Sequence, residues 1–230
     1  MHLKLLSTTL LLSLHLITAH ADCFDDPPGD QQADPPKTSN STDGNAMIEA
    51  LKAIAPRSVE EPCVDLKDAT GECRSAAQAA GPILNSFKRY KIESPAEKAA
   101  LLSLMAYESA GFGYRRSHFP VTVGQGTRNM QIAANNAAYA ESLDELKDEL
   151  AKLKGDKAAI LDLLLKSDDH DFGSAAWFMT TQCSPAVREE LQSGSQEGWE
   201  KYLTRCIRTE ATTQRRDYWE RAREAMKVKS

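Results

Sequence analysis

The sequence predicts a mainly α-helical domain that carries one long loop or a small β-hairpin. Apolar residues recur at helical spacing through residues 74–110 and again through residues 142–226. Between these stretches, residues 111–132 are rich in glycine, aromatic side chains and arginine, and they include a short Val-Thr-Val run. Long connections of this kind in compact domains are often functional.

The first 21 residues have the pattern of a secretory signal peptide. Lys4 gives a positive start, residues 5–17 are apolar but too few to span a bilayer, and Ala19-His20-Ala21 forms a small-x-small cleavage site. We therefore expect cleavage after Ala21 and a secreted, extracellular protein that no longer associates with a membrane. The remaining length suits one domain, and we expect a monomer.

Residues 22–62 form the next segment, which we interpret as a disordered, acidic, Pro-rich linker. It holds nine acidic and three basic residues, and its first half cannot bury enough apolar surface to become ordered. Residues 46–54 are compatible with a short helix. Asn40 begins an Asn-Ser-Thr sequon, which predicts a glycosylation site.

Five cysteines follow the predicted cleavage site. In an oxidising compartment we expect structural disulfides, and local pairing suggests Cys63 with Cys73 and Cys183 with Cys206. Cys23 is then left over. The sequence has no Cys-x-x-Cys or His-x-x-x-His pattern, so it predicts neither a metal site nor a cofactor.

Residues 63–230 are expected to form the folded, helical domain. They carry 24 residues of each charge, and this formal neutrality argues against nucleic-acid binding. Helices are predicted at residues 74–90, with a kink or boundary at Gly81-Pro82, and at residues 95–110, with Ser94 and Glu97 as a capping box. Further helices are predicted at 142–154, 156–165, 172–181 (with Asp171 as N-cap), from 184, at 197–206 and at 210–226.

Glu108 is the strongest candidate for a catalytic residue. It follows Leu101, Leu104 and Met105 by seven, four and three residues, so all four lie on one helix face. A carboxyl group on a buried face must be paired or protonated, and a protonated one is what a general acid requires. The alternative is an ordinary ion pair with Arg115 or Arg116.

The segment that runs from Gly124 to Gln131 is the second candidate feature. Its glycines allow close approach of backbone to a ligand, and Gln125, Asn129 and Gln131 offer both donors and acceptors. This mixture suits sugar hydroxyl and acetamido groups, with Tyr114 available to stack on a sugar ring. The alternative is a turn whose polar residues face solvent.

The order Glu108-Ser109, an aromatic stretch, Gly124-x-Gly126 and then Met130-Gln131 resembles the lysozyme-like superfamily. It is most similar to soluble lytic transglycosylases and goose-type lysozymes, and also to secreted fungal lysozyme-like proteins. The resemblance implies that Glu108 is the general acid. It also implies that Ser109 orients this acid and that Met130 and Gln131 line the sugar site. Trp177 would supply an aromatic contact behind the cleft.

These observations predict a secreted enzyme that cleaves β-1,4-linked amino-sugar polymers of cell walls, with peptidoglycan as the first substrate and chitin or chitosan as the second. Glu141 and Asp168 are the candidates for a second carboxylate. The alternative is a non-catalytic lysozyme-like module that binds cell-wall glycan or a protein partner. Its support is the Thr-Arg-Asn insertion between Gly126 and Met130, where the families have a single Leu.

Overall fold

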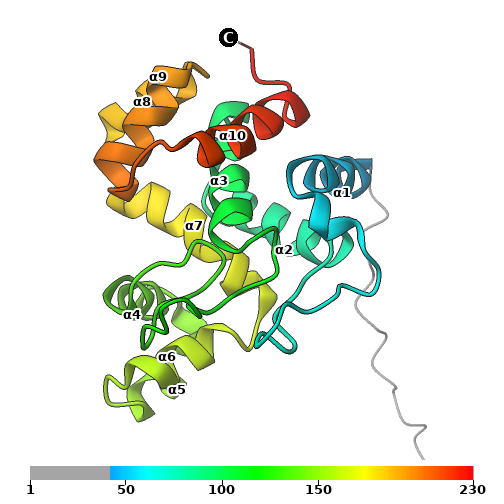
Figure 1. Cartoon of the computed structure of the whole chain (residues 1–230). Coiled ribbons are helices and arrows are strands. Elements are labelled where there is room, and N and C mark those ends of the chain that lie inside the picture. Colours follow the sequence, from blue (N-terminus) through cyan, green and yellow to red (C-terminus); the bar gives the residue numbers. More distant parts are fainter. Residues whose placement is uncertain (1–41, 230) are drawn as a thin grey trace, which may run out of the picture. The chain divides into compact units, whose positions relative to one another are not determined.

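The structure is a computed structural model that describes residues 42–229, and these residues are mainly α-helical, as the sequence predicts (Figure 1). The α-helices are Thr42–Ile54 (α1), Ala76–Arg89 (α2), Pro95–Glu108 (α3), Ala133–Glu141 (α4), Lys147–Lys152 (α5), Lys157–Leu164 (α6), Asp168–Gln182 (α7), Pro185–Gln192 (α8), Gln196–Lys201 (α9) and Thr213–Ala225 (α10). Shorter turns are Pro56–Val59 (η1), Asp144–Leu146 (η2) and the π-helical Tyr202–Ile207 (η3). Strand pairing within this range is limited to isolated bridges that join Gly126 to Arg116 and to Gln131.

Helix α3 is the central helix of the main hydrophobic core. Its alanine and leucine side chains are buried on every face between Ala96 and Ala106, and α10, α8, α7 and α1 pack around it. A helix that is apolar on all sides has to be enclosed in this way. Glu108 is its last residue, so the first polar position after the buried stretch lies where the helix leaves the core.

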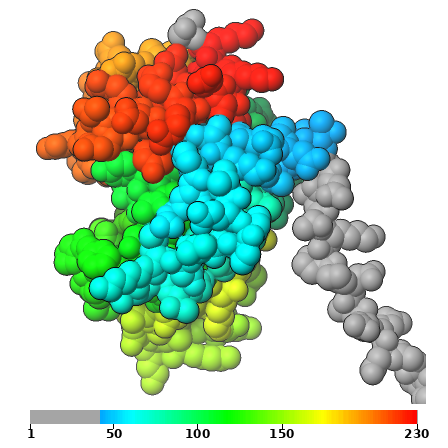
Figure 2. Space-filling view, turned by 45° about the vertical axis from the view of Figure 1, so that its right-hand side comes forward, coloured from blue at the N-terminus to red at the C-terminus, as the bar shows by residue number. Residues whose placement is uncertain are grey.

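Helix α1 corrects the predicted domain boundary. Met47, Leu51 and Ile54 are buried in the main core, and α1 packs against α2 and α10. Figure 2 shows this helix in blue on the same face as the red C-terminal elements. The folded region therefore includes residues 42–62, which the sequence assigned to a linker. The short helix predicted at residues 46–54 of this segment is confirmed as part of α1. The signal peptide, Cys23 and Asn40 lie outside the described residues.

A second, smaller cluster of apolar side chains joins α4 and α6 to α7. Its buried members are Tyr139, Ala140, Leu143, Leu146, Ile160, Leu163, Leu164 and Trp177. The helix predicted at residues 142–154 is wrong in its start, because the alanine-rich segment before it forms α4 and the chain then turns through η2 into the short α5.

Two local predictions about helices α2 and α3 also differ from the structure. Pro82 lies inside an uninterrupted α2, whose Ser75 and Gln78 form a capping box. Ser94 makes no side-chain cap bond, and Glu97 is buried and paired with Arg188, with 2.8 Å between Oε1 and Nε. A long-range ion pair has replaced the local capping interaction, because Glu97 faces α8 rather than its own N-terminus.

Candidate functional site

A cavity of about 610 Å³ lies at the C-terminal end of α3. Five of the residues expected at a sugar site line it together: Glu108, Gln125, Asn129, Met130 and Gln131. The wall opposite the Gln125–Gln131 segment comes from α7, from η3 and the turn after it, and from the first turn of α10. The predicted helix end and the predicted loop therefore meet at one cavity.

The carboxylate of Glu108 is ion-paired. Its Oε1 lies 2.6 Å from Nη2 of Arg215, with side chains 20% and 11% exposed respectively. The Arg215 guanidinium also lies over the Tyr107 ring, 4.1 Å from its centroid. The alternative of an ion pair is thus the observed state, but the partners suggested by the sequence are wrong. Arg115 donates to the carbonyl of Leu165 and Arg116 pairs with Asp162.

The Gly124–Gln131 segment packs closely against neighbouring backbone, and its side-chain amides are fixed by hydrogen bonds. A Cβ atom at Gly126 would lie 2.6 Å from the Arg115 carbonyl, so only glycine fits there. Gln125 donates to the Met130 carbonyl at 3.0 Å, and Gln131 donates to the Asn136 side chain at 2.8 Å. These contacts hold the polar groups at the cavity wall in place, instead of leaving them in solvent.

Arg128 anchors this segment and does not line the cavity. Its side chain and that of Asp171 are both fully buried, with 2.8 Å between Nε and Oδ2. Its other nitrogens donate to three backbone carbonyls, those of Glu72, Phe112 and Tyr114. Burial raises the pKa of the Asp171 carboxyl, against the effect of Arg128. Asp171 is therefore the partner of the loop, and the N-cap of α7 is Ser167.

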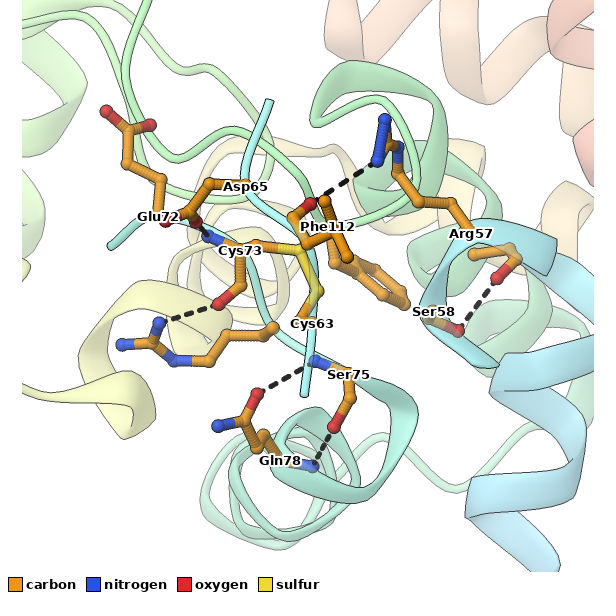
Figure 3. The surroundings of a disulfide bond; sticks show 12 residues. Arg57, Ser58, Cys63, Asp65, Glu72, Cys73, Ser75, Gln78 and Phe112 are labelled. Atoms are coloured by element: carbon orange, nitrogen blue, oxygen red, sulfur yellow. Dashed lines mark hydrogen bonds between the residues drawn. A yellow bond between two sulfur atoms is a disulfide. The ribbon is translucent and has the colours of Figure 1, made fainter. Parts of the chain in front are cut away.

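Glu72 is a second anchor, which the sequence reasoning missed. Figure 3 shows it beside the Cys63–Cys73 disulfide, with its side chain directed away from the sulfur atoms. Its carboxylate accepts hydrogen bonds from the backbone amides of Arg115 at 2.8 Å and Arg116 at 3.2 Å. Its other oxygen lies 2.9 Å from Nε2 of His118. The disulfide loop thus holds the beginning of the long loop, and His118 has a structural contact.

Three residues expected at the substrate site do not line the cavity. Ser109 is buried, donates to the Met105 carbonyl at 2.6 Å and accepts from the Phe112 amide, so it closes the end of α3. Tyr114 packs against the His118 ring, 4.9 Å between centroids. Trp177 is buried against Tyr139. Its neighbour Phe178 lines the cavity in its place.

The two candidates for a second carboxylate are also elsewhere. Asp168 pairs with Arg74 at 2.7 Å, and Glu141 is exposed at the end of α4. Within the described chain, Glu108 is the one acidic residue that lines the cavity. Three arginines line it as well: Arg205, Arg208 and Arg215. Residues 205–230 hold eight Arg or Lys against four Asp or Glu, and this excess is the one feature of the sequence that points to these arginines.

Both predicted disulfides are present. Cys63 is bonded to Cys73 and Cys183 to Cys206. The second disulfide ties the end of α7 to η3, and Cys206 itself contributes to the cavity wall. Two disulfides fit a protein of an oxidising compartment.

Residues 42–229 hold few features that would indicate another kind of site. No group of three or more His, Cys, Asp or Glu side chains in this range is arranged to hold a metal ion. No helix in this range is long and apolar enough to cross a membrane. A second cavity, of about 630 Å³, lies among α1, α2, α3 and α10 and contains none of the predicted site residues.

Comparisons with known proteins give one partial similarity. No family model and no solved structure matches the chain. The chain is 40% identical over 154 residues to a bifunctional dioxygenase–epoxy alcohol synthase of Fusarium oxysporum. The matched region is 64% of this chain but 12% of that protein, so the similarity concerns a small part of a much longer polypeptide.

Proposed function

We propose that the protein is a secreted, lysozyme-like enzyme that cleaves β-1,4-linked amino-sugar polymers, with peptidoglycan as the first substrate and chitin or chitosan as the second. The observation that carries the proposal is the composition of the 610 Å³ cavity, where one glutamate faces fixed amide side chains. Clefts that position a few polar groups precisely around a reactive one are typical of binding and active sites. The resemblance around Glu108 and Met130-Gln131 adds the reaction class.

In the proposed reaction, the protonated carboxyl of Glu108 donates its proton to the glycosidic oxygen. The bond between C1 and that oxygen breaks, and its electron pair stays on the departing sugar. A hydroxyl oxygen then bonds to C1, and the Glu108 carboxylate accepts the proton of this hydroxyl. If the hydroxyl belongs to water the products have reducing ends, whereas a hydroxyl of the same sugar gives an anhydro ring.

The absence of a second acid at the cavity, within residues 42–229, favours the route with a single glutamate. Hydrolases of this type use two carboxyl groups about 5 to 9.5 Å apart. Asp168 and Glu141 do not supply the second one, because Asp168 is paired on another surface and Glu141 lies outside the cavity. An internal hydroxyl as nucleophile needs no second carboxylate, so we expect anhydro products.

The second candidate function is a non-catalytic module that binds glycan or a protein partner. It is favoured by the Glu108–Arg215 ion pair, because Arg215 occupies the carboxylate that a reacting sugar would have to reach. The two activities in the name of the Fusarium relative are not extended to this chain, which covers 12% of that protein.

Replacement of Glu108 by glutamine tests the proposal. We expect the wild-type protein to release soluble fragments from purified peptidoglycan and Glu108→Gln to lose at least about 100-fold of this rate, as for removal of a general acid. Glu197→Gln is the matched control, since Glu197 is 77% exposed and pairs with Lys201 away from the cavity. Mass spectrometry of the fragments distinguishes anhydro from reducing ends.

Equal fragment release by wild type and Glu108→Gln would refute the catalytic role. If wild type releases nothing from peptidoglycan or chitin but sediments with either, the binding module is the correct function. Circular dichroism of each variant confirms that the comparison is between folded proteins.

A further inference from the structure

The cavity around Glu108 has an unusual charge for a site that would bind a neutral sugar chain. Three guanidinium groups and one carboxylate line it among the described residues. Arg215 is paired with Glu108. Arg205 is 59% exposed and lies 3.8 Å from Glu190, a distant contact. The cavity therefore keeps a positive wall after its internal ion pair is counted.

Arg208 is the part of this wall that is free to meet a ligand. It is exposed, and within residues 42–229 its guanidinium has no hydrogen-bond or ion-pair partner. Its backbone is left-handed, with φ 62° and ψ 47°, at the end of η3. The neighbouring Cys206 is bonded to Cys183. The backbone that carries Arg208 is thus tied to α7 by a covalent bond.

The Glu108–Arg215 pair obstructs the carboxyl group that the proposed reaction uses. The Arg215 guanidinium lies 2.6 Å from Oε1 of Glu108, so it occupies a position at this carboxyl that a glycosidic oxygen would need. The pair is also only part-buried, unlike Arg128 with Asp171, whose side chains are both fully buried. A part-buried pair at a cavity wall can exchange partners with a ligand at much lower cost than a fully buried one.

We propose that Arg215 is a latch on Glu108, and that an anionic group of the glycan opens it. A carboxylate on the sugar chain binds Arg208 and draws Arg215 away from Glu108. The released Glu108 carboxylate takes up a proton from solvent and becomes the donor. Arg215 is then a positioning residue, and the preferred substrate class is a glycan that carries carboxylates, ahead of neutral or cationic amino-sugar polymers. This inference rests on the proposed function.

Two soluble polymers with the same β-1,4 backbone test the latch: carboxymethyl chitin, which is anionic, and glycol chitin, which is neutral. We expect wild type to cleave carboxymethyl chitin with a kcat/KM at least about tenfold higher. Arg208→Gln should reduce this preference to about onefold, mainly through KM. Arg215→Gln should cleave glycol chitin faster than wild type, because Glu108 is then accessible without an anionic group to displace the arginine.

Arg216→Gln is the matched control, because Arg216 lies on the same helix, pairs with Glu200 at 3.1 Å and does not line the cavity. It should leave the preference for carboxymethyl chitin and the rate on glycol chitin unchanged. Thermal unfolding followed by circular dichroism verifies that all three variants are folded.

The latch is overturned if wild type cleaves both polymers equally well, or if Arg215→Gln cleaves glycol chitin no faster than wild type does. Failure of the proposed function looks different, since wild type would then cleave neither polymer nor peptidoglycan. In that case equilibrium binding of the two polymers tests whether the arginines of the cavity form an anionic subsite. Tighter binding of carboxymethyl chitin that Arg208→Gln abolishes supports the anionic subsite, whereas equal affinity for both polymers overturns it.

Discussion

Replacement of Arg128 by methionine should destabilise the whole domain, although this side chain is fully buried and does not line the cavity. The guanidinium neutralises the fully buried Asp171 and lies over the Phe172 ring, 4.8 Å from its centroid. It also donates to three backbone carbonyls of two different loops. Methionine keeps most of the apolar volume of the side chain. The variant therefore removes the charge and the hydrogen bonds and leaves only a small cavity.

The expected loss follows from the interactions that remain unsatisfied. Breaking a buried ion pair by removal of one partner costs about 3–5 kcal/mol, and each carbonyl that loses its donor costs about 1 kcal/mol or more. Asp171 relieves part of this penalty by binding a proton. We therefore expect a loss of at least about 4 kcal/mol, which is a large part of the 5–15 kcal/mol of a typical domain.

The loss should depend on pH in a defined direction. Burial raises the pKa of Asp171 above its ordinary value of 3.8, and removal of Arg128 takes away a charge that opposes this rise. A carboxyl whose pKa is higher in the folded protein stabilises the fold at low pH, and this contribution is lost as the pH rises. The loss of unfolding free energy in Arg128→Met, relative to wild type, should therefore be larger at pH 8 than at pH 5.

Urea unfolding followed by tryptophan fluorescence measures these differences, under non-reducing conditions that preserve both disulfides. Arg116→Gln is the control, because Arg116 comes from the same loop and pairs with Asp162 through side chains that are 38% and 59% exposed. An exposed pair of this kind contributes less than about 1 kcal/mol. The reasoning is refuted if both variants lose similar, small amounts of stability, or if the loss in Arg128→Met does not change with pH.

Two further predictions concern the smaller cluster and the cavity wall. The hydrogen bond from Arg89 lowers the pKa of Glu145 to about 2 from 4.5. Its stabilising effect is present above pH 4.5 and lost as the pH falls towards 2, and it stays below about 1 kcal/mol because the side chain is 45% exposed. Glu145→Gln should thus unfold at a lower temperature than wild type at pH 6 and at the same temperature near pH 2. A difference in unfolding temperature that stays constant with pH would contradict this. Replacement of both Cys183 and Cys206 by serine opens a disulfide with a sequence separation of 23 and should cost about 3 kcal/mol in urea unfolding, so an unchanged midpoint would contradict the loop-closure argument.

The sequence predicted those parts of the candidate site that depend on short-range pattern. Glu108 ends an apolar helix, and Gln125, Asn129 and Gln131 follow glycines in a loop. The family resemblance placed this helix end and this loop at one site, and they line one cavity. The sequence could not predict Arg215, which is 107 residues from Glu108. Such a contact depends on how α10 packs across α3, and this packing cannot be predicted from composition or local spacing.

Side chains on fully buried helices were a second source of error. Ala175-Ala176-Trp177-Phe178 is apolar throughout, so periodicity does not tell which aromatic ring faces the cavity. Trp177 packs against Tyr139 in the smaller cluster, and Phe178 lines the cavity. The burial of Arg128 was also not predictable. An arginine in a polar loop is expected in solvent, whereas Arg128 is fully buried.

The charged groups around the loop are of two kinds, fully or largely buried anchors and one part-buried pair at the cavity. The anchors Arg128 and Glu72 hold the loop through buried contacts and do not line the cavity. Removing either should perturb the fold before it perturbs a ligand. Glu108 and Arg215 instead form the part-buried pair inside the cavity, where exchange with a ligand is least costly. The more easily rearranged of these ion pairs is thus the one that lines the cavity, which is where we propose that a substrate binds.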